Sequence, residues 1–244
     1  MINLTRCFPD TPKAELIALL PNIYRNITDV LLETIKAFSL SPAGILKYVQ
    51  PPAPDQLVQY HLHFRGAIIV TAHLANWEWC GYCLTEILHD AGIAVYRPLK
   101  NPRIDALMRC QRQKSGMKIV PMRQIVKLLS KNTHDPHFVL LIADQNPDRD
   151  NAVWEKFFGI PTAFFKGPAA LARRYDLPVF FVHLERTGRH KYRMHLEAMC
   201  LEPASVDVDE ITQMYVRTLE QHIRSAPESW LWTHRRWKHE SPGR

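Results

Sequence analysis

The segment HLANWE, residues 73–78, contains two side chains whose types and spacing suit acid–base chemistry. His73 directly follows an apolar run, and Glu78 comes five residues later. A neutral imidazole can take the proton from a hydroxyl, and a carboxylate beside it can fix its tautomer and stabilise the imidazolium that forms. The pair predicts a general base, His73, oriented by Glu78. A structural histidine is the alternative, because such a spacing carries little information by itself.

Polar residues follow two other apolar runs. Arg97 and Lys100 come just after residues 93–96 and can bind phosphate, Arg as a bidentate fork and Lys as a point charge. A solvated basic loop is the other interpretation. Asp144 follows the apolar run FVLLIA, so we expect its carboxylate near His73, where it could pair with Arg97 or orient substrate. The alternative is a capping role in the turn.

Short apolar runs alternate with helical stretches through the part of the chain that contains these residues. This alternation predicts an α/β fold with a largely parallel central sheet flanked by helices. In such sheets ligands bind where the strands end, which is where His73 and Asp144 are expected. The expected strands are residues 66–72, 93–96, 138–143 and 178–185, and the expected helices are residues 77–90, 103–115, 124–130 and 167–175.

The N-terminal region has helical periodicity instead. Apolar residues recur at helical spacing over residues 12–48, which predicts two amphipathic helices that are broken or kinked near Pro21. These helices either pack on the domain or lie at a membrane interface. A proline-rich loop follows at residues 51–54. We expect one domain over residues 1–244, with a helical region at 1–60 and an α/β core at 61–244.

Composition limits the cell compartment and the partners. With 46% hydrophobic residues and a net charge of +7, the chain is an ordinary globular protein suited to an anionic partner. Five cysteines are an odd number that favours a reducing cytoplasm over a disulfide framework. The start of the chain shows no secretory signal, and no run of about 18 apolar residues predicts a transmembrane helix. Any membrane contact is therefore expected to be peripheral.

The 73–78 segment resembles the His-x-x-x-x-Glu block of the lipid A biosynthesis acyltransferases. These late acyltransferases add lauroyl or myristoyl chains to lipid A precursors and are related to the glycerolipid acyltransferases. The region of Asn3 to Pro9 and Glu33 also fits this family, so the similarity covers nearly the whole chain, in order. The other similar blocks are YRPLKNP at 96–102, ADQN at 143–146, GPAALARR at 167–174 and PESWLWTHRRWK at 227–238.

The resemblance implies a reaction and its participants. A fatty acyl group would pass from acyl carrier protein or acyl-CoA to a hydroxyl of a phosphorylated glycolipid such as a lipid A precursor. His73 would deprotonate the hydroxyl and Glu78 would orient His73, with no metal or further cofactor. The residues assigned to substrate binding are Asn76, Arg97, Lys100 and Asp144.

The implied location is the cytoplasmic face of the bacterial inner membrane. The expected partners are acyl carrier protein, the glycolipid acceptor and the membrane surface, and no nucleic acid. Family members usually begin with a hydrophobic membrane-anchoring helix, and this chain starts after that point, so either its start is truncated or the helix is absent.

Weaker signals have less specific interpretations. Cys80 and Cys83 have redox or half-zinc spacing, but without a second pair they are expected in the core. His61 and His63 are interpreted as surface residues. The C-terminal tryptophans, interleaved with basic residues in 230–238, fit a bilayer interface, nucleic-acid stacking, or core packing with the basic residues exposed.

Three other functions compete with acyl transfer to a lipid A precursor. The same motif would serve acylation of another glycolipid or of an aminolipid. A lipid or thioester hydrolase would need a nucleophile, and no Gly-x-Ser-x-Gly elbow is present. A basic nucleic-acid binder would be expected to carry a recognisable binding motif, and none is readable.

Overall fold

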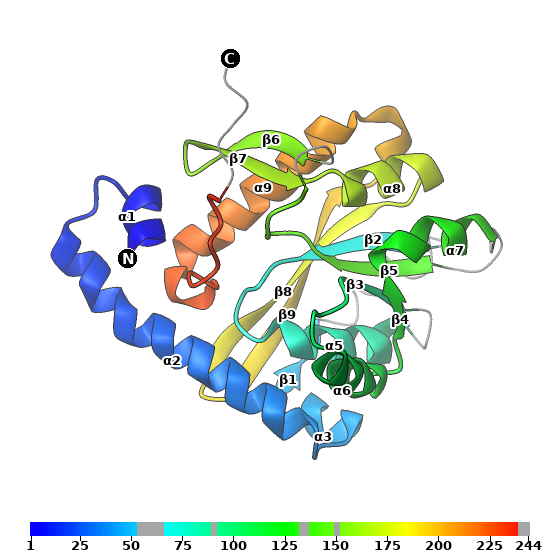
Figure 1. Ribbon diagram of the computed structural model, residues 1–244, viewed down its shortest axis with the longest axis horizontal. Coiled ribbons are helices and arrows are strands. Elements are labelled where there is room, and N and C mark those ends of the chain that lie inside the picture. Colours follow the sequence, from blue (N-terminus) through cyan, green and yellow to red (C-terminus); the bar gives the residue numbers. More distant parts are fainter. Residues whose placement is uncertain (53–65, 89–91, 132–136, 149–151, 239–244) are drawn as a thin grey trace.

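The computed structural model describes residues 1–52, 66–88, 92–131, 137–148 and 152–238 (Figure 1). It has an α/β architecture, as the alternation of apolar runs and helical stretches predicts. His61 and His63 lie outside the described residues. The helices are α1 (Ile2–Cys7), α2 (Lys13–Ala37), α3 (Pro42–Leu46), α5 (Trp77–Leu88), α6 (Pro102–Gln113), α7 (Ile125–Lys131), α8 (Gly167–Tyr175) and α9 (Val208–Ser225), with 3-10 turns η1 (Met122–Gln124), η3 (Pro203–Ser205) and η4 (Pro227–Ser229).

The central sheet has seven strands in the order β1-β9-β8-β2-β5-β3-β4. All neighbouring pairs are parallel except β8 and β9, which form an antiparallel pair. The largely parallel sheet predicted from the sequence is confirmed. The strands are β1 (Val49–Gln50), β2 (Gly66–Thr71), β3 (Gly92–Tyr96), β4 (Lys118–Pro121), β5 (His137–Ile142), β8 (Val179–Gly188) and β9 (Lys191–Cys200), with a separate antiparallel hairpin of β6 (Ala152–Phe157) and β7 (Ile160–Phe165).

Strand β2 is buried because its side chains alternate between two apolar cores. Ile68 and Val70 pack in the core that includes α8 and α9. Ala67 and Ile69 pack in the opposite core with α5. In Figure 1, α8 and α9 lie on one side of the strands and α5 and α6 on the other. This double covering explains why β2 and β5 are continuous apolar runs in the sequence.

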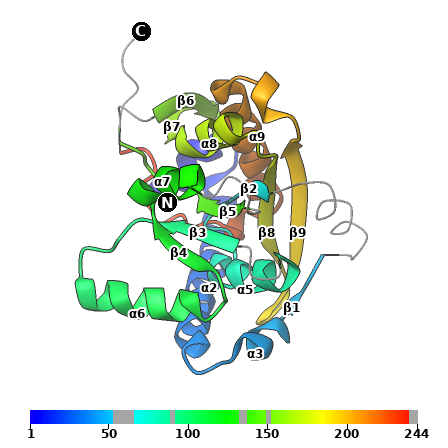
Figure 2. The same ribbon diagram turned by 90° about the vertical axis from the view of Figure 1, so that its right-hand side faces the viewer.

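Helix α6 contributes little to either core. It projects from the body of the molecule (Figure 2), and Gln111 is its one buried side chain. Asn101 caps its N-terminus by accepting hydrogen bonds from the backbone N–H groups of Arg103 and Ile104. The loop that carries Arg97 and Lys100 therefore leads from the sheet edge out to this helix.

Helix α2 differs from the sequence prediction. Residues 13–37 form one continuous helix, so a break near Pro21 is wrong, while the alternative of a kink there stays a prediction. Proline removes one backbone hydrogen bond from a helix interior. Leu16 before Pro21 and Ile23 after it are both buried against the domain, and this packing holds the two halves in one helix.

Several elements had no counterpart in the sequence prediction. These are the short helix α1, the edge strands β1 and β4, the β6–β7 hairpin, β9 and the long helix α9, whereas α3 falls within the helical region predicted for residues 12–48. Strand β9 alternates apolar and charged residues and is half-exposed, and α9 has a mainly polar surface. Neither presents the continuous apolar run that identified the central strands.

Candidate active site

His73 and Asp144 meet beyond the carboxyl ends of two paired strands. Thr71 of β2 pairs with Ile142 of β5 in parallel register, and each functional residue follows two positions later. The Nδ1 atom of His73 lies 2.6 Å from Oδ1 of Asp144. The backbone N–H of His73 donates to Oδ2 of the same carboxylate at 3.1 Å. The strand register thus produces a His–Asp pair from residues 71 positions apart.

Trp230 completes the surroundings of the Asp144 carboxylate. Its indole Nε1–H donates to Oδ2 at 2.9 Å. Asp144 is only 2% exposed, so these donors replace the water that a buried carboxylate loses. Asp144 is therefore not open to substrate or to Arg97. The predicted substrate contact of Asp144 is corrected to orientation of His73.

The charges of this pair fix the tautomer of His73. Burial by itself raises the pKa of Asp144, but the charge of His73 and the hydrogen bonds from His73 and Trp230 hold that pKa well below its usual range. An ionised carboxylate only accepts hydrogen bonds, so Nδ1 of His73 carries the proton. In the neutral ring, Nε2 then keeps the lone pair that a general base requires.

The same contact raises the basicity of His73. Burial lowers the pKa of His73, but the charge of Asp144 and its hydrogen bond more than offset this effect, and the pKa lies above its ordinary value. Nε2 of His73 lies 3.2 Å from the side-chain amide nitrogen of Gln145. The amide N–H can donate to the imidazole lone pair, and a substrate hydroxyl would take its place. The His73 ring also packs edge-on against Trp77, with centroids 4.9 Å apart.

Residues 73–76 form the turn that carries His73, called the catalytic turn here. Backbone hydrogen bonds from the C-terminal segment stabilise it. The backbone N–H of Leu231 donates to the carbonyl of His73, and that of Ala75 donates to the carbonyl of Ser229. Ala75 has a positive φ of 43°, a backbone conformation that costs an L-residue free energy and that this pairing stabilises. The turn is thus held in place by residues more than 150 positions later in the chain.

Core packing is confirmed for the C-terminal tryptophans. Trp230 and Trp232 are buried, and Trp237 packs against the same core. The expectation that the basic residues between them are exposed is wrong for Arg236. This side chain is buried, donates to Asn146 and to the carbonyl of Ala163, and lies over the Phe164 ring.

Glu78 does not contact Nδ1 of His73. Its carboxylate accepts hydrogen bonds from Nε and Nη2 of Arg112 in α6, at 3.0 and 2.7 Å. Its charge still contributes to the raised pKa of His73, after the larger effects of burial and Asp144. The predicted orientation of His73 by Glu78 is therefore corrected, because Asp144 occupies that position and α5 directs Glu78 toward α6.

We expect Glu78→Gln to lower the free energy of unfolding by about 1–3 kcal/mol, because it leaves the Arg112 guanidinium without its ionic partner. Arg112→Gln removes the same ion pair from the other side and should cost a similar amount. Chemical denaturation of both variants and of the double variant measures the coupling between them. An Arg112→Gln variant as stable as the unmodified chain would contradict this account.

The side chain of Asn76 bonds to other parts of the protein and is not exposed to a substrate. It is fully buried, and its Oδ1 accepts a hydrogen bond from the backbone N–H of Trp79, as an N-cap of α5. Its Nδ2 donates to Glu33 in α2 at 2.6 Å. Glu33 also accepts a hydrogen bond from the Tyr192 hydroxyl. The predicted substrate contact of Asn76 is corrected: this amide joins the catalytic turn to α2.

The remaining predicted residues lie apart from the His–Asp pair. Arg97 and Lys100 are exposed in the loop between β3 and α6. The side chains of Cys80 and Cys83 are buried free thiols in the core beneath α5, as expected. Within the part of the chain that the structure describes, the residues at the His73 ring are therefore Asp144, Gln145 and Trp77.

Sequence reasoning assigned no role to Gln145, Trp230 or Arg112. Gln145 follows Asp144 directly, so its proximity to His73 could have been inferred from the β2–β5 pairing. Trp230 lies in a block whose similarity was recognised but whose location was not. Arg112 lies in a helix identified only by its periodicity, and no local signal marks it as the partner of Glu78.

Residues 1–239 match the family described as bacterial lipid A biosynthesis acyltransferase. The lipid A biosynthesis palmitoleoyltransferase of Escherichia coli is 25% identical over 241 residues, which cover 97% of this chain and 76% of that protein. The E. coli lipid A biosynthesis lauroyltransferase is 25% identical over 243 residues, covering 97% and 77%. A phosphatidylinositol mannoside acyltransferase of Mycolicibacterium smegmatis is 26% identical over 178 residues, covering 71% and 57%. This chain is similar to all three.

Proposed function

The chain belongs to the bacterial lipid A biosynthesis acyltransferase family and is an acyltransferase, and we propose that it esterifies a hydroxyl of a phosphorylated glycolipid of the lipid A precursor class. The resemblance found in the sequence blocks is thereby confirmed. The observation that carries the proposal is the His73–Asp144 pair, which leaves Nε2 of His73 as a base at the end of the sheet. The proposed acyl donor is a thioester on acyl carrier protein, with acyl-CoA as the alternative.

The proposed reaction needs no enzyme nucleophile. Nε2 of His73 takes the proton of the acceptor hydroxyl while the hydroxyl oxygen attacks the thioester carbonyl carbon. When the tetrahedral intermediate collapses, the carbon–sulfur bond breaks and the imidazolium gives its proton to the departing sulfur. The Asp144 carboxylate stays hydrogen-bonded to Nδ1–H and stabilises the imidazolium between the two transfers. Before this, the acceptor hydroxyl must displace the Gln145 amide from Nε2.

An apolar cleft beside Trp77 is the proposed site of the acyl chain. Gly81 and Tyr82 of α5 line it, together with Met117, Ile119 and Leu140, and its volume is about 60 Å³. Its position next to Trp77 would bring the thioester end of a bound chain to His73. Methionine side chains are adaptable, and we propose that Met117 moves aside to admit a longer chain.

The proposed phosphate contacts are Arg97 and Lys100. Both side chains are exposed in the loop that follows Tyr96, a residue that lines the proposed acyl cleft. The excess of positive charge on the chain also suits an acidic carrier protein and an anionic membrane surface.

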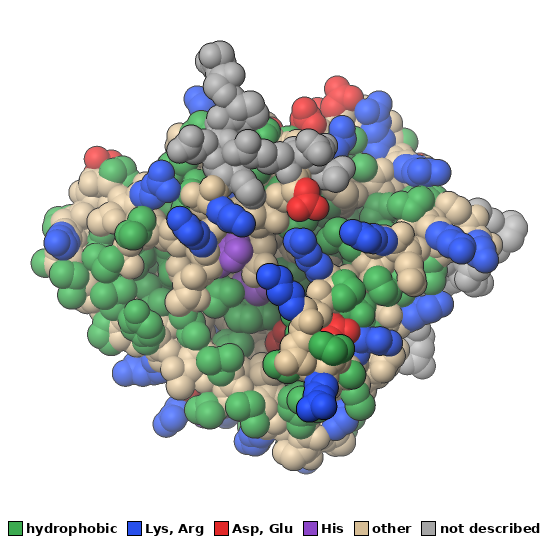
Figure 3. Space-filling view, viewed as in Figure 1, with side chains coloured by type: hydrophobic (Ala, Val, Ile, Leu, Met, Phe, Trp, Pro, Cys, Tyr) green, Lys and Arg blue, Asp and Glu red, His purple; other side chains and the backbone are tan. Residues whose placement is uncertain are grey.

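We propose peripheral binding to the cytoplasmic face of the inner membrane through the outer surface of α2. Among the described helices, none combines the length and apolar character needed to cross a bilayer. Ile17, Tyr24, Leu31 and Ile35, spaced along one helical face, are nevertheless 48–66% exposed. Figure 3 shows apolar side chains gathered over α2, beside a hollow where histidine is visible and Lys and Arg lie around the rim. An apolar helix surface with cations nearby is suited to an anionic bilayer.

Purified protein should transfer a lauroyl group from acyl carrier protein to an acylated, phosphorylated glucosamine disaccharide, detected by mass spectrometry of the lipid product. Parallel reactions with acyl-CoA and with a phosphatidylinositol mannoside acceptor distinguish the alternative donor and acceptor. Free fatty acid as the main product would contradict acyl transfer and indicate a hydrolase. Lipids from cells with and without the gene identify the acceptor independently.

A further inference from the structure

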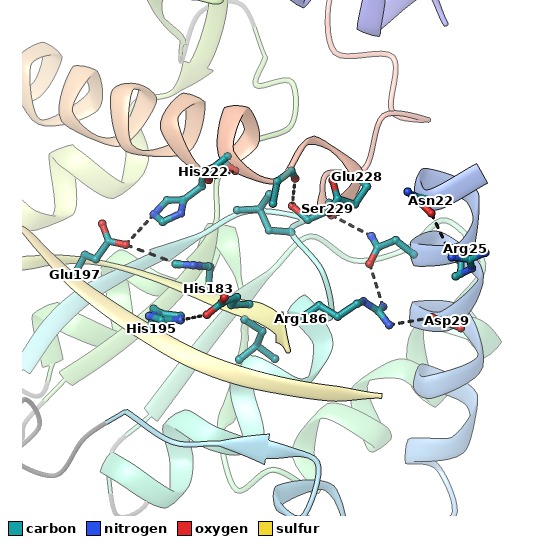
Figure 4. Close-up of a pocket in the computed structure, with 16 residues that line it drawn as sticks. Asn22, Arg25, Asp29, His183, Arg186, His195, Glu197, His222, Glu228 and Ser229 are labelled. Atoms are coloured by element: carbon teal, nitrogen blue, oxygen red, sulfur yellow. Dashed lines mark hydrogen bonds and ion pairs between the residues drawn. The ribbon is translucent and has the colours of Figure 1, made fainter. Parts of the chain in front are cut away.

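Three histidines and three glutamates line a second cavity, which borders the catalytic turn at Leu74. The cavity has a volume of about 640 Å³ and lies between α2, the β8–β9 ribbon and the C-terminal end of α9. His183 comes from β8, Glu197 from β9 and His222 from α9, and Figure 4 shows the Glu197 carboxylate between the two imidazoles. No step of the proposed reaction uses these residues.

The three side chains place atoms that could bind a metal ion close together. Nε2 of His222 lies 2.8 Å from Oε1 of Glu197, and Nδ1 of His183 lies 4.0 Å from the same oxygen. One ligand atom from each residue falls within 4.8 Å of the other two. Tetrahedral Zn²⁺ with bonds of about 2.0–2.1 Å separates its ligand atoms by about 3.3 Å, so small side-chain rotations would satisfy it.

The chemistry of His183 points to a cation. Its Nδ1 atom is buried and has no hydrogen-bond partner among the described residues. A buried polar atom without a partner costs free energy, and a bound ion is one of the few explanations for it.

We propose that His183, Glu197 and His222 form a Zn²⁺ site with its fourth position open to the cavity. Two imidazoles and one carboxylate suit zinc, whereas Mg²⁺ and Ca²⁺ prefer oxygen ligands. The partial exposure of His222 and Glu197 gives the ion a path of entry. His195 is not a ligand in this proposal, because its ring stacks on His183 and its Nε2 contacts Glu185 at 2.6 Å.

Zinc bound here would join α9 to the β8–β9 ribbon. Helix α9 leads directly into η4 and Trp230, the residue that donates to Asp144. Metal binding would therefore stabilise the native fold by mass action and restrict the segment that supports the catalytic turn.

The test is a Zn²⁺ titration of chelator-treated protein, with calorimetry for affinity and stoichiometry and thermal unfolding for stability. We expect one equivalent of Zn²⁺ per chain and a melting temperature that rises with Zn²⁺ concentration. Glu197→Gln and His222→Gln should each bind at least about 10-fold more weakly. His195→Gln, which changes a histidine of the same cavity, is the matched control and should bind as the unmodified chain does.

Cobalt provides a second measurement that does not depend on stability. Co²⁺ bound by two imidazoles and a carboxylate in a tetrahedral site should give visible absorption in the unmodified chain and in His195→Gln, and not in His222→Gln. The proposal fails if the unmodified chain shows no saturable Zn²⁺ binding, if Glu197→Gln and His222→Gln both keep full affinity, or if His195→Gln loses affinity as they do. None of these outcomes decides whether the chain transfers acyl groups, which the product assay tests separately.

Discussion

Replacing His73 by alanine is expected to lower the rate of acyl transfer by about 10²–10⁴-fold, the usual contribution of a general base. In the proposed mechanism Nε2 of His73, whose Nδ1 is held by Asp144, is the atom that takes the proton of the acceptor hydroxyl. Steady-state kinetics with the acyl thioester and the glycolipid acceptor measure the loss. The effect should appear mainly in kcat, because alanine removes proton transfer and leaves the proposed acyl and phosphate contacts in place.

The controls for this variant separate chemistry from folding. His73→Ala should keep a circular dichroism spectrum and cooperative unfolding like those of the unmodified chain, because the backbone hydrogen bonds of the turn to Ser229 and Leu231 do not involve the imidazole. His195→Gln, on β9, should retain activity. Turnover close to normal in a folded His73→Ala variant would eliminate the proposed mechanism.

Replacing Asp144 by asparagine is expected to lower kcat by a similar factor, through His73. Asparagine has the shape of aspartate but no negative charge, so it neither fixes Nδ1–H nor stabilises the imidazolium. Its NH₂ group must occupy either the Oδ1 position, where it faces Nδ1 of His73, or the Oδ2 position, where it faces the N–H donors of the His73 backbone and Trp230. Some loss of stability should accompany the loss of rate, and thermal unfolding in parallel quantifies it.

The pH profile distinguishes this positioning role from a purely structural one. The base must be neutral, and Asp144 raises the pKa of His73, so activity of the unmodified chain should rise with pH through a midpoint above the ordinary histidine value. Removing the negative charge lowers the pKa of His73. The acidic limb of the pH–activity profile of Asp144→Asn should therefore move to lower pH. Trp230→Phe, which keeps the carboxylate, should move the limb less. An unshifted limb in Asp144→Asn would show that Asp144 does not act on His73.

The sequence by itself determined the fold class and the place of His73, the proposed base, in that fold. The runs GAIIVT and FVLLIA are continuously apolar because both faces of β2 and β5 are buried, and this local property is visible without any structure. His73 and Asp144 end these runs, so their place at the sheet edge follows from the sequence. The order of the motif blocks then indicated the family.

The sequence did not determine which carboxylate orients His73. Proximity along the chain favoured Glu78, five residues away, over Asp144, 71 residues away. The β2–β5 register places His73 and Asp144 at the same level, and α5 carries Glu78 to Arg112 instead. The gathering of His183, Glu197 and His222 likewise depends on three elements far apart in the chain. Strand register and helix packing are long-range properties, so only the tertiary structure decided these partnerships.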